Sequence, residues 1–325
     1  MGDRVSGAMK AVLHYDTSPG VHRMIAALDP AIVRTIAVAE ADTAGLRREL
    51  ADADVLLHVL APVTRKIMSA APRLKLVQKI GVGVDAIDRD AARARGIAVC
   101  NMPGTNTAAV AELSLSLMLA TLRRVTALDA GLRAGAGWPA SSTHLDVAGE
   151  LDGATVGLIG YGAVARRLRP VLLALGARVL VHARTQPDDG VPSVPLDDLL
   201  SSADVVSLHL PSNAATQGLL DARRIAGMKA GAILINTARG ALVDEAALIG
   251  ALESGRLAGA GLDVFAREPL EPGHRFLALP NIVLTPHVAW MTPGTWRRSL
   301  AVVTENCRRL AVGEALLHRV DGGGP

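Results

Sequence analysis

The sequence has 325 residues, half of them hydrophobic and 20% charged, which excludes a disordered chain and leaves room for two domains with separate cores. The formal net charge is only +3, and basic residues are interleaved with acidic ones, so no nucleic-acid-binding surface is expected. The two cysteines, Cys100 and Cys307, make no disulfide framework and lack metal-ligand spacing, so no metal site is predicted.

No signal peptide and no membrane-spanning stretch is predicted, because no basic start precedes an apolar block and the longest apolar runs contain charges or glycine. A cytoplasmic protein without membrane contact is therefore expected.

Short apolar runs alternate with helix-length segments in the first part of the chain. We expect strands at residues 9–15, 32–38, 55–60, 76–80 and 97–101, separated by helices such as 20–28 and 43–51. The runs do not alternate polar and apolar residues, which is typical of a parallel sheet with helices on both faces.

Residues 106–124 differ, because Val110, Leu113, Leu117 and Ala120 recur at helical spacing and predict a long amphipathic helix. Residues 130–151 are rich in small residues and are expected to form a loop. A second strand series follows at 155–159, 178–182, 205–208, 233–236, 258–263 and 282–284, and then a helix over 295–317. The pattern predicts an α/β fold with two doubly wound parallel-sheet domains.

A glycine turn follows the strand at 155–159. Gly160 would allow the tight turn, Gly162 would let the backbone approach a pyrophosphate, and the helix starting near Ala163 and Val164 would direct its N–H groups at the phosphates. The strand before the turn and the helix after it favour dinucleotide binding over a merely structural turn.

The next strand lacks the terminal acid that bonds an adenine ribose, and Arg184 follows instead. An arginine without a neighbouring carboxylate suits a 2′-phosphate, so NADP is favoured as cofactor and NAD remains possible. Stacking on adenine, or simple solvation, is the alternative role for Arg184.

Three residues at or beyond strand ends would complete a reductase site. His287 is suited to proton transfer, Glu268 to stabilising and orienting the protonated ring, and Arg239 to holding a carboxylate and a developing oxyanion. Taken singly, each residue has an ordinary structural alternative. Backbone N–H groups around Val82 and Gly83 would hold the other carboxylate oxygen.

Several motifs, in order, resemble those of the D-isomer-specific 2-hydroxyacid dehydrogenases, a family that includes glyoxylate/hydroxypyruvate reductases and phosphoglycerate dehydrogenases. Besides the glycine turn, they are Lys79-Ile-Gly-Val-Gly-Val-Asp85-Ala-Ile-Asp88, Asn101-Met-Pro-Gly, Val110-Ala-Glu112, Asn236-Thr-Ala-Arg-Gly240, Asp263-Val-Phe-Ala-Arg-Glu268-Pro and Thr285-Pro-His287-Val-Ala-Trp290.

The resemblance implies a discontinuous, flavodoxin-like substrate-binding domain made of residues 1–102 plus 288–325. A Rossmann dinucleotide-binding domain, residues 103–287, would be inserted between these parts, with the active site in the cleft and a homodimer formed largely through the nucleotide domains.

The resemblance also assigns Arg239, Glu268 and His287 the roles given above, and it implies that Asp263 bonds the nicotinamide carboxamide. We expect further cofactor contacts from Pro211, Thr216, Thr237 and Ala238. Asp263 has the alternative of satisfying loop amides. Trp290 is expected either to shape the substrate pocket or to belong to the core, and His58 and His209 to be structural or to line the cleft.

The loop after the third strand, residues 58–64, carries no cation before Arg65, so a phosphorylated substrate is not favoured. We expect a NAD(P)H-dependent reductase of glyoxylate, hydroxypyruvate or a similar small 2-keto acid. The alternative is a nucleotide-sensing, co-repressor-like binding protein on the same fold. Formate or phosphite oxidation is disfavoured, because formate enzymes of this family replace the Glu partner of the His, and Glu268 is present.

Overall fold

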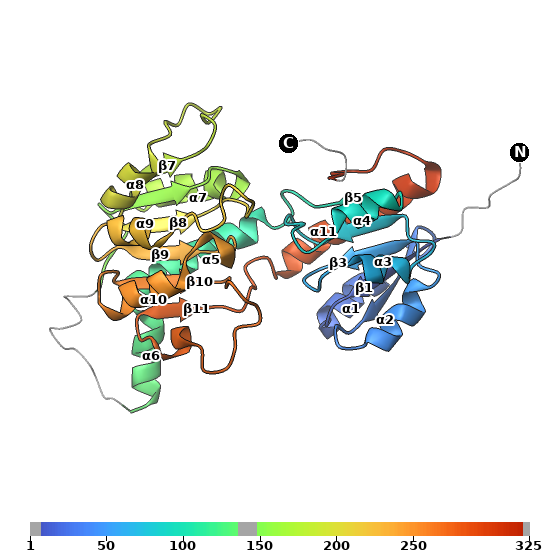
Figure 1. The fold of residues 1–325 in the computed structure, drawn as a ribbon, viewed down its shortest axis with the longest axis horizontal. Helices are drawn as coiled ribbons and strands as arrows, with labels where there is room; N and C mark the ends of the chain where they lie inside the picture. Colours follow the sequence, from blue (N-terminus) through green and yellow to red (C-terminus); the bar gives the residue numbers. More distant parts are fainter. Residues whose placement is uncertain (1–7, 136–147, 321–325) are drawn as a thin grey trace, which may run out of the picture. The chain divides into compact units, whose positions relative to one another are not determined.

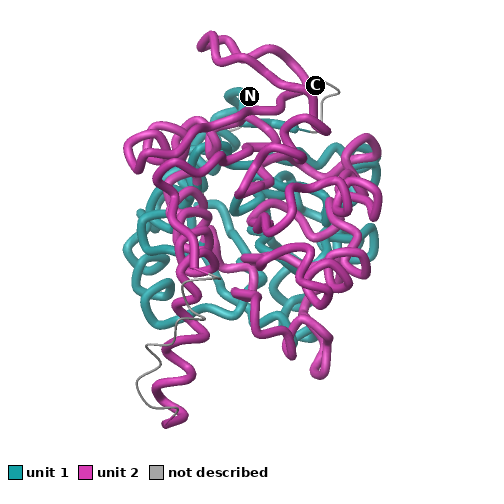
Figure 2. The backbone as a smooth tube through the Cα atoms, turned by 90° about the vertical axis from the view of Figure 1, so that its left-hand side faces the viewer, with its two compact units in different colours: residues 1–106, 291–325 teal, residues 107–290 magenta. Residues whose placement is uncertain are grey.

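The computed structural model describes residues 8–135 and 148–320 of the chain. The chain forms two compact units (Figure 2): unit 1 contains residues 1–106 and 291–325, and unit 2 contains residues 107–290. The boundaries expected after residues 102 and 287 differ from the observed boundaries, after residues 106 and 290, by four and three residues.

Unit 1 is built on a five-stranded parallel sheet with the strand order β2-β1-β3-β4-β5 (Figure 1). The order reverses between β1 and β3, which is the flavodoxin-like arrangement. Its strands are β1 (Met9–His14), β2 (Val33–Val38), β3 (Val55–His58), β4 (Leu76–Lys79) and β5 (Ala98–Cys100).

Helices cover both faces of the unit 1 sheet, and polar caps fix where several begin. Ser18 accepts a hydrogen bond from the N–H of Val21, and Asp88 accepts one from the N–H of Ala91. One core packs α2, α3 and α4 on the sheet, while α1 lies beside α11. The helices are α1 (Pro19–Ala26), α2 (Thr43–Leu50), α3 (Arg65–Ser69), α4 (Arg89–Ala94) and α11 (Pro293–Val312).

The C-terminal part of the described chain closes the outer edge of this sheet. Val320 donates its N–H to the carbonyl of Val99, and the carbonyl of His318 accepts from Asn101. The helix expected over 295–317 ends earlier, at Val312, because Gly313 adopts a left-handed conformation (φ 73°) and turns the chain toward β5.

Unit 2 contains a six-stranded parallel sheet with the order β11-β10-β9-β8-β6-β7 (Figure 1). Ser193 adds a one-residue parallel bridge to β7, next to Val181. If this bridge is counted as a strand next to β7, the strand order read from the β7 edge is that of a Rossmann sheet. The sequence order of the strands reverses between β6 and β8. The strands are β6 (Thr155–Ile159), β7 (Arg178–His182), β8 (Val205–Leu208), β9 (Ile233–Asn236), β10 (Gly259–Leu262) and β11 (Ile282–Leu284).

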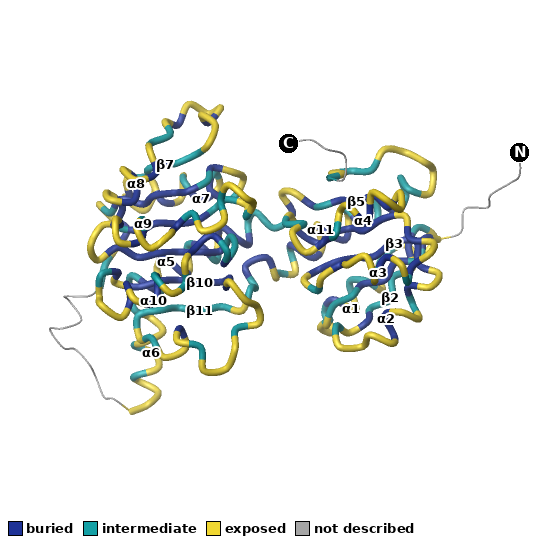
Figure 3. Tube along the Cα trace, viewed as in Figure 1, coloured by how far each residue is buried: buried dark blue, intermediate teal, exposed yellow. Residues whose placement is uncertain are grey.

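Two cores lie on opposite faces of the unit 2 sheet. Ile233 and Ile235 pack with α5 and α7, whereas Leu234 between them packs with α8, α9 and α10. Figure 3 shows the resulting band of buried residues along the inner strands of the sheet, while β11 at its edge is only partly buried. The helices are α5 (Thr107–Leu122), α6 (Val125–Arg133), α7 (Ala163–Ala174), α8 (Leu196–Ser202), α9 (Ala222–Gly227), α10 (Glu245–Glu253) and the short 3₁₀ turns η2 (Gly240–Leu242) and η3 (Arg275–Ala278).

The helix expected over 106–124 is present as α5, which packs against both α7 and the strands β9 and β10. One expectation for this region was wrong. Residues 130–133, expected in a loop, belong to α6, where Asp129 and Arg133 form an i,i+4 ion pair of 2.8 Å. Residues 136–147 of the expected loop lie outside the described part of the chain.

Candidate active site in unit 2

The three predicted catalytic residues lie on loops that leave neighbouring parallel strands at the same edge of the unit 2 sheet. Arg239 follows β9, Glu268 follows β10 and His287 follows β11. Because β9 pairs with β10 and β10 with β11, the carboxyl ends of these strands share one edge.

Glu268 and His287 are in direct contact. Oε2 of Glu268 lies 2.6 Å from Nδ1 of His287, and Oε1 of Glu268 accepts the N–H of Phe265 at 3.0 Å. A carboxylate can only accept, so Nδ1 carries the proton in this pair. The other ring nitrogen, Nε2, therefore remains for proton exchange with a ligand.

Asp263 shapes the loop that carries His287. Its fully buried carboxylate accepts the hydroxyl of Thr285 at 2.6 Å and the N–H groups of Val288 and Ala289, each at 2.9 Å. His287 itself has φ 55°, a left-handed conformation that costs about 1 kcal/mol or more in a residue with a side chain. The structure therefore shows the loop-supporting role that was the alternative for Asp263, and its contact with a nicotinamide stays a prediction.

The loop that carries Arg239 is fixed by two residues that sequence reasoning missed as site residues. Asn236 donates its amide to the carbonyl of Arg239 at 2.9 Å and accepts the N–H of Ala238 at 3.0 Å. Gly240 lies against the backbone of Phe265, where an added Cβ would be 1.9 Å from the carbonyl carbon. Asn236 and Gly240 both belong to the Asn-Thr-Ala-Arg-Gly motif, and this was the sequence signal that could have identified them as site residues.

The electrostatics of the site keep Glu268 ionised. Burial raises the pKa of this carboxyl, but the hydrogen bond and charge of His287, the N–H of Phe265 and the charge of Arg239 outweigh it, so the pKa lies below its ordinary value. The guanidinium of Arg239 also donates to the carbonyl of Ala238 at 2.6 Å.

The glycine turn after β6 fits a dinucleotide. Gly160 has φ 88°, and a Cβ there would lie 2.5 Å from the carbonyl oxygen of His209, so a side chain is excluded. A Cβ on Gly162 would meet nothing within 4 Å, which leaves open space over the start of α7. Among the described residues, no acceptor bonds the N–H groups of Gly162, Ala163 and Val164, which suits phosphate oxygens.

The other predicted cofactor residues lie on loops next to this turn. Thr216 donates its hydroxyl to the carbonyl of Pro211 at 2.7 Å and closes the loop after β8, which neighbours β6. Thr237 is buried and its hydroxyl lies 2.8 Å from that of Ser114 on α5. Burial lowers the pKa of His209 to about 4, so this ring is neutral near pH 7.

Arg184 is exposed, two residues beyond the end of β7. Within the described residues it has no hydrogen bond or ion pair, so its guanidinium remains available for an anion. Trp290 is buried at the end of unit 2, and its contact with a substrate stays a prediction.

Val82 and Gly83 belong to unit 1, in the loop after β4. No described acceptor bonds their N–H groups, while the carbonyl of Val82 accepts the amide of Asn101 at 3.0 Å. The left-handed glycine of this loop is Gly81, with φ 128°.

His58, at the end of the neighbouring strand β3, is 3% exposed, and both of its ring nitrogens lack a hydrogen-bond partner among the described residues.

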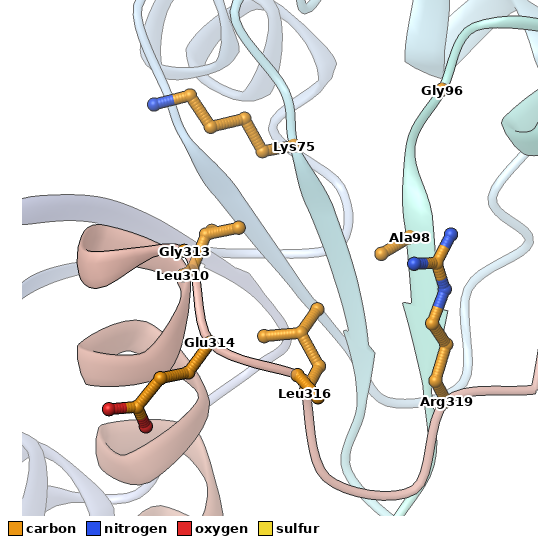
Figure 4. A pocket seen from close by; sticks show the side chains of 9 residues that line it. Lys75, Gly96, Ala98, Leu310, Gly313, Glu314, Leu316 and Arg319 are labelled. Carbon is orange, nitrogen blue, oxygen red and sulfur yellow. The ribbon is translucent and has the colours of Figure 1, made fainter.

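A separate cavity of about 470 Å³ occurs in unit 1 (Figure 4). Lys75 and Gly96 precede β4 and β5, so the cavity lies at the amino ends of these strands, whereas Val82 and Gly83 follow a carboxyl end. None of its lining residues is a predicted site residue.

Within the described residues, no group of three or more His, Cys, Asp or Glu is placed to hold a metal ion. In the same part of the chain, no helix is long and apolar enough to span a bilayer.

Residues 115–289, more than half of the chain, match the model of the NAD-binding domain of D-isomer-specific 2-hydroxyacid dehydrogenases. The chain belongs to this family. It is 40% identical over 279 residues to a D-3-phosphoglycerate dehydrogenase of Mycobacterium bovis, covering 84% of this chain and 52% of that protein. A glyoxylate reductase of Aeropyrum pernix is 38% identical over 272 residues, with 81% of each chain covered.

Solved structures of the family agree with the two-unit α/β fold. The TT0316 protein of Thermus thermophilus superposes with a TM-score of 0.85 at 39% identity, covering 96% of this chain and all of that one. An NADPH-dependent glyoxylate/hydroxypyruvate reductase of Sinorhizobium meliloti, solved with NADP and malonate, gives a TM-score of 0.82 at 30% identity and covers 97% of each chain. The chain spans about half the length of the mycobacterial phosphoglycerate dehydrogenases it matches.

Proposed function

We propose that this protein is an NAD(P)H-dependent reductase of small 2-keto acids, acting reversibly on the corresponding D-2-hydroxy acids. The observation that carries the proposal is the 2.6 Å contact between Glu268 and His287. A carboxylate with a lowered pKa, bonded to one ring nitrogen, stabilises the protonated imidazole that ketone reduction requires.

A reduced nicotinamide dinucleotide held at the glycine turn would supply the hydride that the carbonyl carbon accepts. His287 then donates the proton from Nε2 to the carbonyl oxygen, and Glu268 holds the ring in the required tautomer. Arg239 binds the substrate carboxylate and stabilises the negative charge that develops on the oxygen. We assign Val82 and Gly83, through their N–H groups, to the other carboxylate oxygen, and Trp290 to the wall of the substrate pocket.

Substitution of the three residues tests this assignment. We expect His287→Gln and Arg239→Lys to lower kcat/KM for glyoxylate at least a hundredfold, which corresponds to about 2.7 kcal/mol of transition-state stabilisation. The exposed His22→Gln and Arg297→Lys serve as matched controls and should retain activity. Nucleotide binding without turnover of any 2-keto acid by the unaltered protein would instead favour the sensor alternative.

Among substrates, we propose glyoxylate, hydroxypyruvate or a similar short 2-keto acid over a phosphorylated one. Arg65, the first cation after β3, is exposed at the start of α3. The ammonium of Lys79, buried beside that loop, donates to the carbonyl of Val59. A panel of glyoxylate, hydroxypyruvate, pyruvate and 3-phosphohydroxypyruvate tests the proposal, which fails if the phosphorylated acid gives the highest kcat/KM.

For the cofactor, we propose NADPH over NADH. The support is the exposed guanidinium of Arg184, at the point where a ribose-binding acid is absent. We further assign contacts with the cofactor to the glycine turn, to Pro211, Thr216, Thr237 and Ala238, and to Asp263. Arg184→Ala should weaken NADPH binding at least tenfold and NADH binding little; equal losses would contradict phosphate recognition.

We also propose that the protein forms a homodimer through unit 2. Val125 and Leu132 on α6 are 52% and 50% exposed, and Leu119 on α5 is 38% exposed, which is a large apolar exposure for neighbouring helices. Light scattering after size-exclusion chromatography tests this, with Leu132→Lys expected to shift the protein toward monomer.

A further inference from the structure

One ion-paired cluster in unit 2 joins the segment that follows β7 to the glycine turn before α7. Arg166, in the first turns of α7, pairs with Asp188 at 2.5 Å and with Asp189 at 3.0 Å. Its guanidinium lies 4.8 Å from the ring centre of Tyr161, whose hydroxyl donates to Asp189 at 3.1 Å. Tyr161 itself stands between Gly160 and Gly162.

This cluster places two carboxylates in the loop that follows β7. The end of β7 is where an acid bonds the adenine ribose in NAD-binding Rossmann domains. Asp189 also accepts the N–H of Val191 at 3.3 Å, and two residues further on Ser193 pairs with Val181 of β7. The segment after β7 therefore carries two acids, later in the sequence than the terminal acid of an NAD-binding domain.

The charges of the cluster oppose one another. A free carboxylate would accept hydrogen bonds from the 2′-hydroxyl of NADH and would repel the 2′-phosphate of NADPH. Arg166 offsets one of the two negative charges of Asp188 and Asp189, and Arg184, which has no ion pair among the described residues, offsets the other. Removing the cation or the anion of this pair should thus shift cofactor preference in opposite directions.

We propose that the Arg166–Asp189 pair sets the cofactor specificity of this protein, with Arg166 masking the carboxylates that would otherwise select NADH. The inference rests on the proposed binding of a nicotinamide dinucleotide at the glycine turn. Arg166 and Asp189 are accordingly specificity-determining residues, and the ratio of the two nucleotide affinities is the quantity they control.

The test measures Kd for NADPH and NADH by fluorescence titration, without substrate. Arg166→Gln should raise the ratio Kd(NADPH)/Kd(NADH) at least tenfold, because it exposes Asp188 and Asp189. Asp189→Asn should lower the ratio at least threefold, because it removes one negative charge and leaves Asp188 as the remaining ion-pair partner of Arg166 in the cluster. Arg167→Gln, which removes the same charge from the exposed neighbouring position of α7, should change the ratio less than twofold.

If the cluster only stabilises the loop after β7, a different result is expected. Arg166→Gln and Asp189→Asn would then both loosen this loop and shift the ratio Kd(NADPH)/Kd(NADH) in the same direction. Equal signs for the two variants, or no change in either, would overturn the proposal. If Arg166→Gln does not fold, as judged by thermal unfolding, Asp189→Asn decides alone through the direction of its shift. An unaltered protein that binds neither nucleotide would refute the proposed function itself.

Discussion

Gly240 packs against the backbone of Phe265 so closely that a Cβ at residue 240 would lie 1.9 Å from the Phe265 carbonyl carbon. This contact joins the loop after β9, which carries Arg239, to the loop after β10, which carries Glu268. The relative placement of the guanidinium and the carboxylate therefore depends on the absence of a side chain at one position.

Gly240→Ala should accordingly separate the two loops. We expect a loss of about 2 kcal/mol or more in the free energy of unfolding and at least a fiftyfold lower kcat/KM, because backbone atoms cannot yield as a flexible side chain can. Gly250→Ala in α10 is the matched control, since a Cβ there meets nothing within 4 Å, and it should be neutral or stabilising. Urea unfolding and steady-state kinetics check both; unaltered kinetics in Gly240→Ala would contradict the coupling.

Asp263→Asn tests the support of the His287 loop. The two oxygens of Asp263 accept three donors, and an asparagine offers only one oxygen, so at least one of the Thr285, Val288 or Ala289 donors would face an NH₂ group. We expect about 1–3 kcal/mol of destabilisation and a fall in kcat that exceeds the change in KM. Asp198→Asn, at an exposed position, provides the control. Retention of full kcat would show that the loop holds His287 without this carboxylate.

Glu268→Gln should change the pH dependence of stability in a defined direction. The pKa of Glu268 in the folded protein is lowered, because His287, Phe265 and Arg239 outweigh the effect of burial. A carboxyl of this kind stabilises the fold above its unfolded pKa, and the stabilisation is lost as the pH falls through its folded pKa. The difference in unfolding free energy between wild type and Glu268→Gln should therefore be largest near pH 7 and shrink toward pH 3.

The same substitution should alter catalysis. Without the carboxylate, Nδ1 of His287 loses the acceptor that holds the ring in its tautomer and orientation, so kcat/KM for glyoxylate should fall at least tenfold. Steady-state kinetics measure this, and an unchanged kcat/KM would argue against Glu268 as the partner in proton transfer.

His58 should make unit 1 less stable in acid. Burial and the nearby charge of Lys79 lower the pKa of His58 to about 3, whereas an unfolded histidine titrates near 6.5. Between these values the unfolded chain binds the extra proton, so stability falls by up to about 1.4 kcal/mol for each unit the pH is lowered. His58→Leu removes this proton uptake. Its advantage in urea unfolding should grow from pH 6.5 to pH 4, and parallel pH curves would contradict the assignment.

The sequence was sufficient for the strands and for the residues that follow them. Each strand of unit 2 is a short run in which apolar residues predominate, and a loop residue after such a run lies beyond the carboxyl edge of a parallel sheet, which located Arg239, Glu268 and His287. The family resemblance is confirmed by the match over residues 115–289.

What the sequence could not provide are contacts between segments that only the folded chain brings together. Asp189 lies in a loop, and its partner Arg166 lies on α7, more than twenty residues earlier in the sequence. The fit of Gly240 against Phe265 depends on loop geometry rather than on periodicity. The single bridge at Ser193 is too short to leave an apolar run. For α6, small residues suggested a loop, but the Asp129–Arg133 pair supports a helix.

The closure of β5 by residues 318–320 has a consequence for synthesis on the ribosome. Unit 2 is continuous, so it can complete its sheet as soon as residue 290 has emerged from the exit tunnel. Unit 1 waits for α11 and the segment that covers Val99, and until then its nascent edge strand offers unpaired amides to any neighbouring chain. The part of the polypeptide made first is thus the last to reach its native state.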